Sequence, residues 1–241
     1  MDRFSRTRML LGEKALEKLA SSRVAVFGVG GVGGYTLEAL VRSGIGAVDI
    51  IDNDKVSESN INRQIIALTS TIGRDKVDVA EERILDINPD CKVAKHKCFF
   101  LPETSKDFDF TLYDYVVDAI DTITAKIELV KKAQEANVPI ISSMGAGNKL
   151  DGTRFKVADI YDTKTCPLAR KMRQLCKNNG IKSLKVVYSE EQPLDAIGFN
   201  TAAEPGEKPA GKQRFPGSVG FVPSVAGLII AGEVIKDLIK Q

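Results

Sequence analysis

A glycine-rich turn follows a short apolar run near the start of the chain. Residues 24–27 are Val-Ala-Val-Phe, and the pattern Gly28-x-Gly30-Gly31-x-Gly33 comes directly after them. Glycines let such a turn close tightly and let backbone N–H groups approach phosphate oxygens, while the N-terminus of a following helix attracts anions. A tight turn that binds nothing has the same pattern, so the glycines alone are weak evidence. Between a strand and a helix they predict a nucleotide site.

An acidic residue, Asp52, follows the next apolar run, residues 47–51. It comes about 20 residues after the glycine turn, where an acidic side chain can accept hydrogen bonds from ribose hydroxyls. The turn and Asp52 together predict a bound nucleotide. On this evidence alone, a nicotinamide or flavin dehydrogenase would be the first interpretation, ahead of an enzyme that uses ATP.

Polar and basic side chains come soon after Asp52, and they favour ATP. They are Asn60, Arg63, Gln64 and Lys76. The planar guanidinium of Arg63 can bind a phosphate through two donors, and Lys76 can act as a point charge on phosphates. Hydride transfer does not require this positive charge. Nucleotidyl transfer does, because the negative charge on the transferring phosphorus and on the leaving pyrophosphate must be stabilised. The alternative for Lys76 is a solvated lysine in the first turn of a helix.

Asp121 follows the apolar segment 115–120, which we expect to be a strand. A carboxylate at the carboxyl end of a strand suits Mg²⁺, which prefers oxygen ligands that it shares with phosphates. The alternative is that Asp121 caps the N-terminus of the next helix. Taken with Arg63 and Lys76, Asp121 predicts a catalytic site for ATP and Mg²⁺.

The elements that must position these residues alternate between strands and helices. Short apolar runs predict strands, and apolar residues at helical spacing predict helices. Up to residue 145 we expect a helix that ends near Ser43, further helices at 76–87 and 124–137, and strands at 22–29, 47–51, 93–99, 115–120 and 138–143. This alternation predicts an α/β fold with a Rossmann-like, doubly wound and mostly parallel sheet.

The second half of the chain is less regular, and we expect part of it to be antiparallel. The pattern predicts strands at 154–161 and 185–189, helices at 167–177 and about 223–239, and a Gly- and Pro-rich loop at 199–218. The chain shows no internal repeat and no clear linker. We therefore expect one domain over residues 1–241, with a nucleotide-binding half at about 1–145 and a substrate-facing half at about 146–241.

In combination, these residues resemble the superfamily of ubiquitin-activating-enzyme-like adenylating proteins. The shared signature is Gly28-x-Gly30-Gly31-x-Gly33, Asp52, Ser59-Asn60-x-x-Arg63-Gln64, Lys76 and Asp118-x-x-Asp121. The resemblance implies that Asp52 binds the ribose of ATP, that Asn60, Arg63 and Lys76 bind the triphosphate, and that Asp121 binds Mg²⁺. In these families an arginine near the N-terminus often reaches across a homodimer, and the matching residue here is Arg6.

Within this superfamily, the cysteines separate two kinds of substrate. Activators of sulfur-carrier proteins usually have two C-x-x-C pairs for zinc, whereas the four cysteines here form no such pair: Cys91, Cys98, Cys166 and Cys176. The chain is instead similar to the tRNA threonylcarbamoyladenosine dehydratases, at segments that include Arg42-Ser43-Gly44-Ile45-Gly46, Asn60-x-Asn62-Arg63-Gln64-Ile65 and Gly145-Ala146-Gly147.

The second resemblance implies a reaction on tRNA. ATP would adenylate the threonyl carboxylate of threonylcarbamoyladenosine, a modified adenosine next to the anticodon, and ring closure would then remove water overall. The alternative is adenylation of the C-terminal glycine of a ubiquitin-like sulfur-carrier protein, with a carrier or sulfur-transfer protein as the partner.

The net charge of only +2 gives no general signal for nucleic acid, but cations gather locally. They are Arg170, Lys171, Arg173, Lys177, Lys182 and Lys185 on and after one expected helix, with Lys208, Lys212 and Arg214 in the expected loop. We expect a footprint for tRNA phosphates here, and a solvated helix face is the alternative.

The sequence predicts a cytoplasmic protein without stable membrane insertion. It has no apolar stretch long enough to span a bilayer and no secretory signal. The cysteines are expected to be reduced and mostly buried. The exception is Cys166, which precedes Pro167 in a turn that we expect to be exposed. A chemical role for its thiol is the alternative to a structural one.

Overall fold

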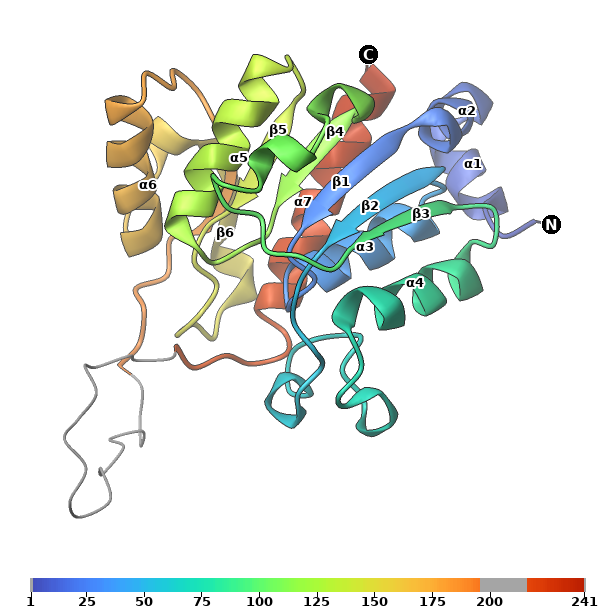
Figure 1. Cartoon of the computed structure of the whole chain (residues 1–241), viewed down its shortest axis with the longest axis horizontal. Coiled ribbons are helices and arrows are strands. Elements are labelled where there is room, and N and C mark those ends of the chain that lie inside the picture. The colour runs from blue at the N-terminus through green and yellow to red at the C-terminus, as the bar shows by residue number, and fades with distance from the viewer. Residues whose placement is uncertain (1, 196–215, 241) are drawn as a thin grey trace.

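The computed structural model describes residues 2–195 and 216–240, which form a seven-stranded sheet with helices on both faces (Figure 1). The sheet order is β3-β2-β1-β4-β5-β7-β6. Its strands are β1 (Arg23–Phe27), β2 (Ala47–Ile51), β3 (Lys92–His96), β4 (Tyr115–Asp118), β5 (Ile140–Ser143), β6 (Phe155–Asp159) and β7 (Lys185–Ser189). Neighbours are parallel except β6 and β7, which are antiparallel. The predicted fold class is therefore confirmed.

Seven α-helices pack around this sheet in the described part of the chain. They are α1 (Ser5–Leu11), α2 (Glu13–Ser21), α3 (Gly33–Arg42), α4 (Lys76–Ile87), α5 (Ile123–Glu135), α6 (Pro167–Asn178) and α7 (Pro223–Lys240). The sequence did not predict α1 and α2. None of the described helices is long and apolar enough to cross a membrane. The expected loop at 199–218 lies mostly outside the described residues.

The core consists of two layers, one on each face of the sheet. Successive side chains of a strand point to opposite faces. Val24 and Val26 of β1 accordingly pack with side chains of α2, α3, α4 and α7. Ala25 and Phe27 pack on the other face, with side chains of α5 and α6.

The chain changes direction in the sheet at β1. From β1 it passes to β2 and β3 on one side, and then returns to β4 on the other side of β1. Phe27 is in register with both Ile51 of β2 and Asp118 of β4, so the residues after these three strands meet at one edge. A crevice at such a switch point is where doubly wound sheets bind ligands.

The connection from β3 to β4 contains only two short 3-10 helices, Ser105–Asp107 and Phe110–Leu112. Aromatic side chains cover the sheet there, and Phe27 contacts Phe100 with ring centroids 4.9 Å apart. The predicted strand 93–99 is wrong at its end. Pairing with β2 stops at His96, whose carbonyl accepts the N–H of Asp52 at 3.2 Å.

Candidate active site

The glycine turn lies between β1 and α3, and two of its glycines are required by its shape. Gly28 has a φ of +92°, and a Cβ there would lie 2.7 Å from the carbonyl oxygen of Ala119. A Cβ on Gly33 would overlap the carbonyl oxygen of Gly28. Gly33 therefore serves the turn itself and does not line the neighbouring cleft, whereas Gly28, Gly30 and Gly31 do.

The backbone of this turn can receive an anion. The N–H groups of Gly30, Gly31 and Val32 donate to no atom of the described residues. All three residues line the cleft at the N-terminus of α3. Unpaired N–H groups at a helix N-terminus favour phosphate binding, through both hydrogen bonding and the helix dipole.

Asp52 is fixed at the end of β2 before any ligand arrives. Its carboxylate accepts the N–H of Val29 at 2.7 Å and the N–H of Asp54 at 2.8 Å. Burial raises the pKa of Asp52, and the nearby cation of Lys76 opposes that effect. The side chain lines the cleft, where it can accept a hydrogen bond from a ribose hydroxyl.

Lys76 begins α4, but its side chain is only 6% exposed. Its Nζ donates to Asp54 at 2.7 Å and lies 3.9 Å from Asp52. The alternative of a solvated lysine is therefore wrong. Two carboxylates position the ammonium group at the cleft, so it can meet the negative charge of a nucleotide.

The segment after Asp52 presents three polar side chains to the cleft. Asn60 and Gln64 begin and end one turn of chain, in which the N–H of Gln64 donates to the carbonyl of Asn60. The guanidinium of Arg63 donates to the carbonyl of Ser59 at 2.8 Å and to Asn62 Oδ1 at 2.9 Å, which orients it. Gln64 is buried, and its Oε1 has no partner among the described residues. A buried polar atom without a partner costs free energy, so this side chain suits a site that a polar ligand completes.

Asp121 lies exposed in the loop between β4 and α5 and lines the cleft. The N-cap of α5 is Thr122, so the capping alternative is wrong. No group of three His, Cys, Asp or Glu side chains among the described residues could ligate a metal. Asp121 therefore fits a cation that takes its other ligands from phosphates and water, as Mg²⁺ does.

The structure brings most of the predicted residues into one cleft of about 520 Å³. Of the predicted residues, it is lined by Gly28, Gly30, Gly31, Asp52, Asn60, Arg63, Gln64, Lys76 and Asp121. Arg6 does not line it. Arg6 lies exposed on α1, which is followed by α2 and packs against it.

The sequence analysis did not predict several other residues that line the cleft. Cys98, Phe99 and Phe100 line the cleft after β3, and Ala146 and Gly147 line it after β5. Their positions after the carboxyl ends of strands could have indicated this, because ligands bind there in such sheets. Pro216, Ser218 and Pro223 come from the other end of the sequence, and Asn62 Nδ2 anchors this segment by donating to the carbonyl of Ser218 at 2.9 Å.

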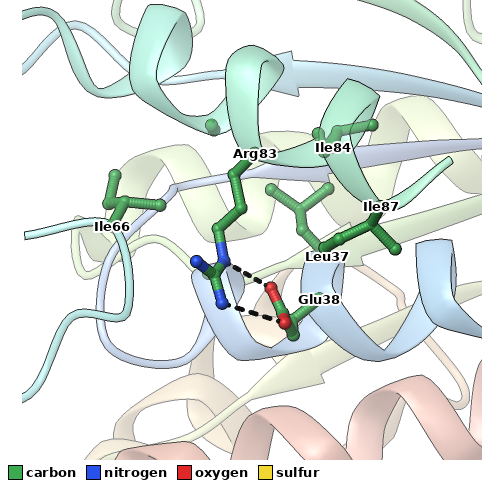
Figure 2. Close-up of a pocket in the computed structure, with 8 residues that line it drawn as sticks. Leu37, Glu38, Ile66, Arg83, Ile84 and Ile87 are labelled. Atoms are coloured by element: carbon green, nitrogen blue, oxygen red, sulfur yellow. Dashed lines mark hydrogen bonds and ion pairs between the residues drawn. The ribbon is translucent and has the colours of Figure 1, made fainter. Parts of the chain in front are cut away.

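A second, smaller pocket does not form a ligand site. It lies between α3 and α4, lined by residues that include Leu37, Ile84 and Ile87 (Figure 2). The ion pair between Arg83 and Glu38 lies beside it, with Nε to Oε2 at 2.6 Å. Its volume is about 10 Å³, which is roughly the space of one water molecule.

Cys98 lies at the cleft but does not have the surroundings of a nucleophile. All four cysteines are free, and only Cys98 lines the cleft. Burial raises the pKa of Cys98, which disfavours the nucleophilic thiolate. The expectation of an exposed Cys166 is wrong, because this residue is the N-cap of α6 and its side chain is buried in the core.

Two of the cations predicted to bind tRNA phosphates have protein partners in the structure. Arg173 donates to the carbonyl and the Oγ1 of Thr163, at 2.9 and 3.0 Å. Lys185 pairs with Asp237 at 2.7 Å and Glu233 at 3.1 Å. Both cations therefore serve the fold. The three cations of the expected loop, Lys208, Lys212 and Arg214, lie outside the described residues.

Comparisons with known proteins agree with this geometry. The model of the ThiF family matches residues 4–241. The chain is 46% identical to the tRNA threonylcarbamoyladenosine dehydratase of Bacillus subtilis, covering 100% of this chain and 96% of that protein. It is 41% identical to the protein of that name from Escherichia coli, covering 99% and 94%.

Solved structures give the same answer. The crystal structure of the E. coli tRNA N6-threonylcarbamoyladenosine dehydratase in complex with AMP matches with a TM-score of 0.88 and 32% identity, over 99% of this chain and 94% of that one. The structure of the E. coli protein in complex with ATP matches with a TM-score of 0.87, 33% identity and the same coverage. The chain therefore belongs to the ThiF family, among the tRNA threonylcarbamoyladenosine dehydratases.

Proposed function

We propose that this chain uses ATP to dehydrate threonylcarbamoyladenosine in tRNA to a cyclic product. The observation that carries the proposal is the single cleft in which the glycine turn, Asp52, Arg63, Lys76 and Asp121 meet. A relative also supports the proposal: structures of the E. coli protein contain ATP and AMP. These are the substrate and product of an adenylation followed by release of AMP.

The reaction begins with attack of the threonyl carboxylate on the α-phosphorus of ATP. The bond to pyrophosphate breaks, and the carboxylate becomes an acyl-adenylate. A nitrogen or oxygen atom of the carbamoyl group then attacks the acyl carbon and displaces AMP, and a carbamoyl nitrogen loses the proton. The oxygen that joined carboxylate to phosphorus leaves with AMP, so the modified base loses the elements of one water molecule.

The chain's own side chains orient ATP and stabilise the charge that develops on it. Asp52 accepts from the ribose, and the N–H groups of Gly30 and Gly31 donate to phosphate oxygens. Arg63 and Lys76, with Asn60 and Gln64, bind the triphosphate. The positive charges act most strongly when the pyrophosphate leaves, and this difference between ground state and transition state is what raises the rate.

Asp121 is the residue that would bind Mg²⁺ with the phosphates of ATP. The ion, when bound, neutralises phosphate charge and polarises the phosphorus–oxygen bonds. Asp121 suits this role because its carboxylate is exposed at the cleft and accepts only a long hydrogen bond among the described residues, from the hydroxyl of Thr122 at 3.4 Å.

The test measures AMP release and tRNA mass. The purified protein is incubated with ATP and Mg²⁺, and either tRNA carrying threonylcarbamoyladenosine or a ubiquitin-like sulfur-carrier protein. We expect AMP release with the modified tRNA and loss of one water from its nucleoside by mass spectrometry. AMP release that depends on the carrier and ignores the modified tRNA would replace this proposal by the carrier alternative. We propose that the reaction takes place in the cytoplasm, because its substrate is tRNA.

We further propose that Arg6 completes the cleft of a second copy in a homodimer. Arg6 is exposed on α1 and does not line the cleft of its own chain. The same helix exposes 76% of Met9 and 85% of Leu10, and two such apolar side chains side by side favour a protein interface.

A mixed dimer tests this arrangement. Arg6→Ala and Asp121→Ala chains with different tags are co-expressed, and the heterodimer is purified through both tags. Each homodimer is expected to be inactive, whereas the heterodimer has one complete site and should reach about half the wild-type rate of AMP release. An inactive heterodimer, or failure to recover one when wild-type chains with the same tags do form one, counts against an arginine supplied by the partner.

A further inference from the structure

We infer that the exposed face of α6 binds the sugar-phosphate backbone of the tRNA beside the adenylation cleft. This inference rests on the proposed function, since it names the surface that receives the proposed substrate. In Figure 1, α6 lies at the edge of the molecule, beyond α5 and far from α4.

The charge of this region differs from that of the rest of the chain. The segment from Thr163 to Leu184 contains six lysines and arginines and no aspartate or glutamate. The whole chain has a net charge of only +2, so the remaining residues are net negative. A concentration of positive charge on one segment of a protein whose other residues are net negative is typical of a polyanion site.

Three cations of α6 are available to a ligand. Arg170, Lys171 and Lys177 are exposed, and none forms an ion pair with a described residue. Many surface lysines elsewhere are paired, including Lys95, Lys97, Lys132, Lys156 and Lys236. A phosphate that meets an unpaired cation does not have to displace a carboxylate first.

The fold presents these cations on one side of the helix. The opposite side of α6 buries Ala169, Met172 and Cys176 in the core. Arg170 and Lys177 are seven residues apart, which is about 10 Å along an α-helix. Arg170 and Lys177 therefore lie nearly in line, and Lys171 projects about 100° around the helix from Arg170, so the three charges form a broad basic face that can contact phosphates of a strand.

The helix is firmly attached, and its N-terminal end approaches the cleft wall. Arg173 anchors it through its bonds to Thr163. A Cβ on Gly145 would lie 3.7 Å from Leu168 and 3.8 Å from Cys166, so the start of α6 packs on the loop after β5. The next residues of that loop, Ala146 and Gly147, line the cleft. A tRNA bound along α6 can thus place a nearby modified base at the site of adenylation.

The test compares two triple variants that remove equal charge. One carries Arg170→Ala, Lys171→Ala and Lys177→Ala. The control carries Lys14→Ala, Lys92→Ala and Lys106→Ala, three exposed lysines outside α6 that form no ion pair with described residues. The Kd for modified tRNA is measured over a range of salt concentrations, together with the Kd for ATP and the Tm.

We expect the α6 variant to bind tRNA at least about tenfold more weakly at 0.15 M salt, and its log–log salt slope to fall by about 2 to 3, since each phosphate contact contributes nearly one unit. Its Kd for ATP and its Tm should match those of the wild type. The control should bind tRNA within about twofold of the wild type.

An unchanged tRNA affinity and salt slope in the α6 variant overturns the inference, and so does an equal loss in the control. A loss confined to AMP release with a carrier protein would assign the face to an acidic protein instead. The proposed function fails separately, if the wild-type protein releases no AMP with modified tRNA. If the wild type reacts and the α6 variant reacts with an unchanged KM for tRNA, only this inference fails.

Discussion

Replacing Arg63 by alanine is expected to lower kcat/KM for AMP release by about 10²- to 10³-fold, the usual loss when one preorganised donor to developing charge is removed. The hydrogen bonds from the Arg63 guanidinium to Ser59 and Asn62 already hold this group in one orientation at the cleft. Little reorganisation is therefore needed when pyrophosphate leaves. Stability should change by less than about 0.5 kcal/mol, because Arg63 lies only partly buried and both acceptors that it releases are on exposed residues.

Two further variants make this result specific. Arg63→Lys keeps the charge but loses the planar pair of donors, so we expect it to recover only part of the rate. Arg154→Ala removes an exposed arginine that also donates to a backbone carbonyl, that of Glu190, outside the cleft. It should leave kcat/KM unchanged. Wild-type kcat/KM in Arg63→Ala would mean that another cation supports the transfer.

Much of the fold could be predicted because buried strands leave a clear pattern. Residues 47–51, 76–87 and 185–189 have the observed bounds of β2, α4 and β7. Parallel strands are buried on both faces, so they appear as short apolar runs, and ligand-binding residues follow their carboxyl ends. Asp52 and Asp121 could be singled out for this reason.

The remainder depends on tertiary contacts that no local pattern contains. Cys98, Phe99 and Phe100 are apolar, and the sequence predicts that they end or follow a strand. Their place in the cleft wall depends on the end of the pairing between β3 and β2 at His96. Arg170 and Arg173 are both arginines of the same expected helix, and the sequence does not distinguish them. In the structure Arg170 is exposed, whereas Arg173 donates a hydrogen bond to Thr163. The insertion of β7 between β5 and β6 likewise follows from packing across the second half.

A buried ion pair beneath the cleft is expected to dominate the stability of this region. Lys126 and Asp118 are both completely buried, with Nζ 2.9 Å from each carboxylate oxygen. Ser142 also donates to Asp118, and Asp118 accepts the N–H of Ile120 at 3.3 Å. This network ties the end of β4 to β5 and α5, and it fixes the start of the loop that carries Asp121.

Replacing Lys126 by alanine should therefore lower the free energy of unfolding by about 3 to 5 kcal/mol, because it leaves the Asp118 carboxylate buried without its cation. For a chain of this size the Tm should fall by roughly 10 °C. The matched control is Lys132→Ala on the same helix, whose exposed pair with Glu135 should contribute less than about 1 kcal/mol. Chemical denaturation measures both variants.

The double variant Asp118→Asn, Lys126→Met separates the charge from the packing. It removes both charges at once and keeps most of the volume, so it should be clearly more stable than Lys126→Ala, as is usual when a buried pair is replaced as a whole. If the loop that carries Asp121 depends on this network, the folded double variant should still bind ATP with an increased KM. A Lys126→Ala protein as stable as Lys132→Ala would contradict the assignment, because a completely buried carboxylate cannot lose its only cation at no cost.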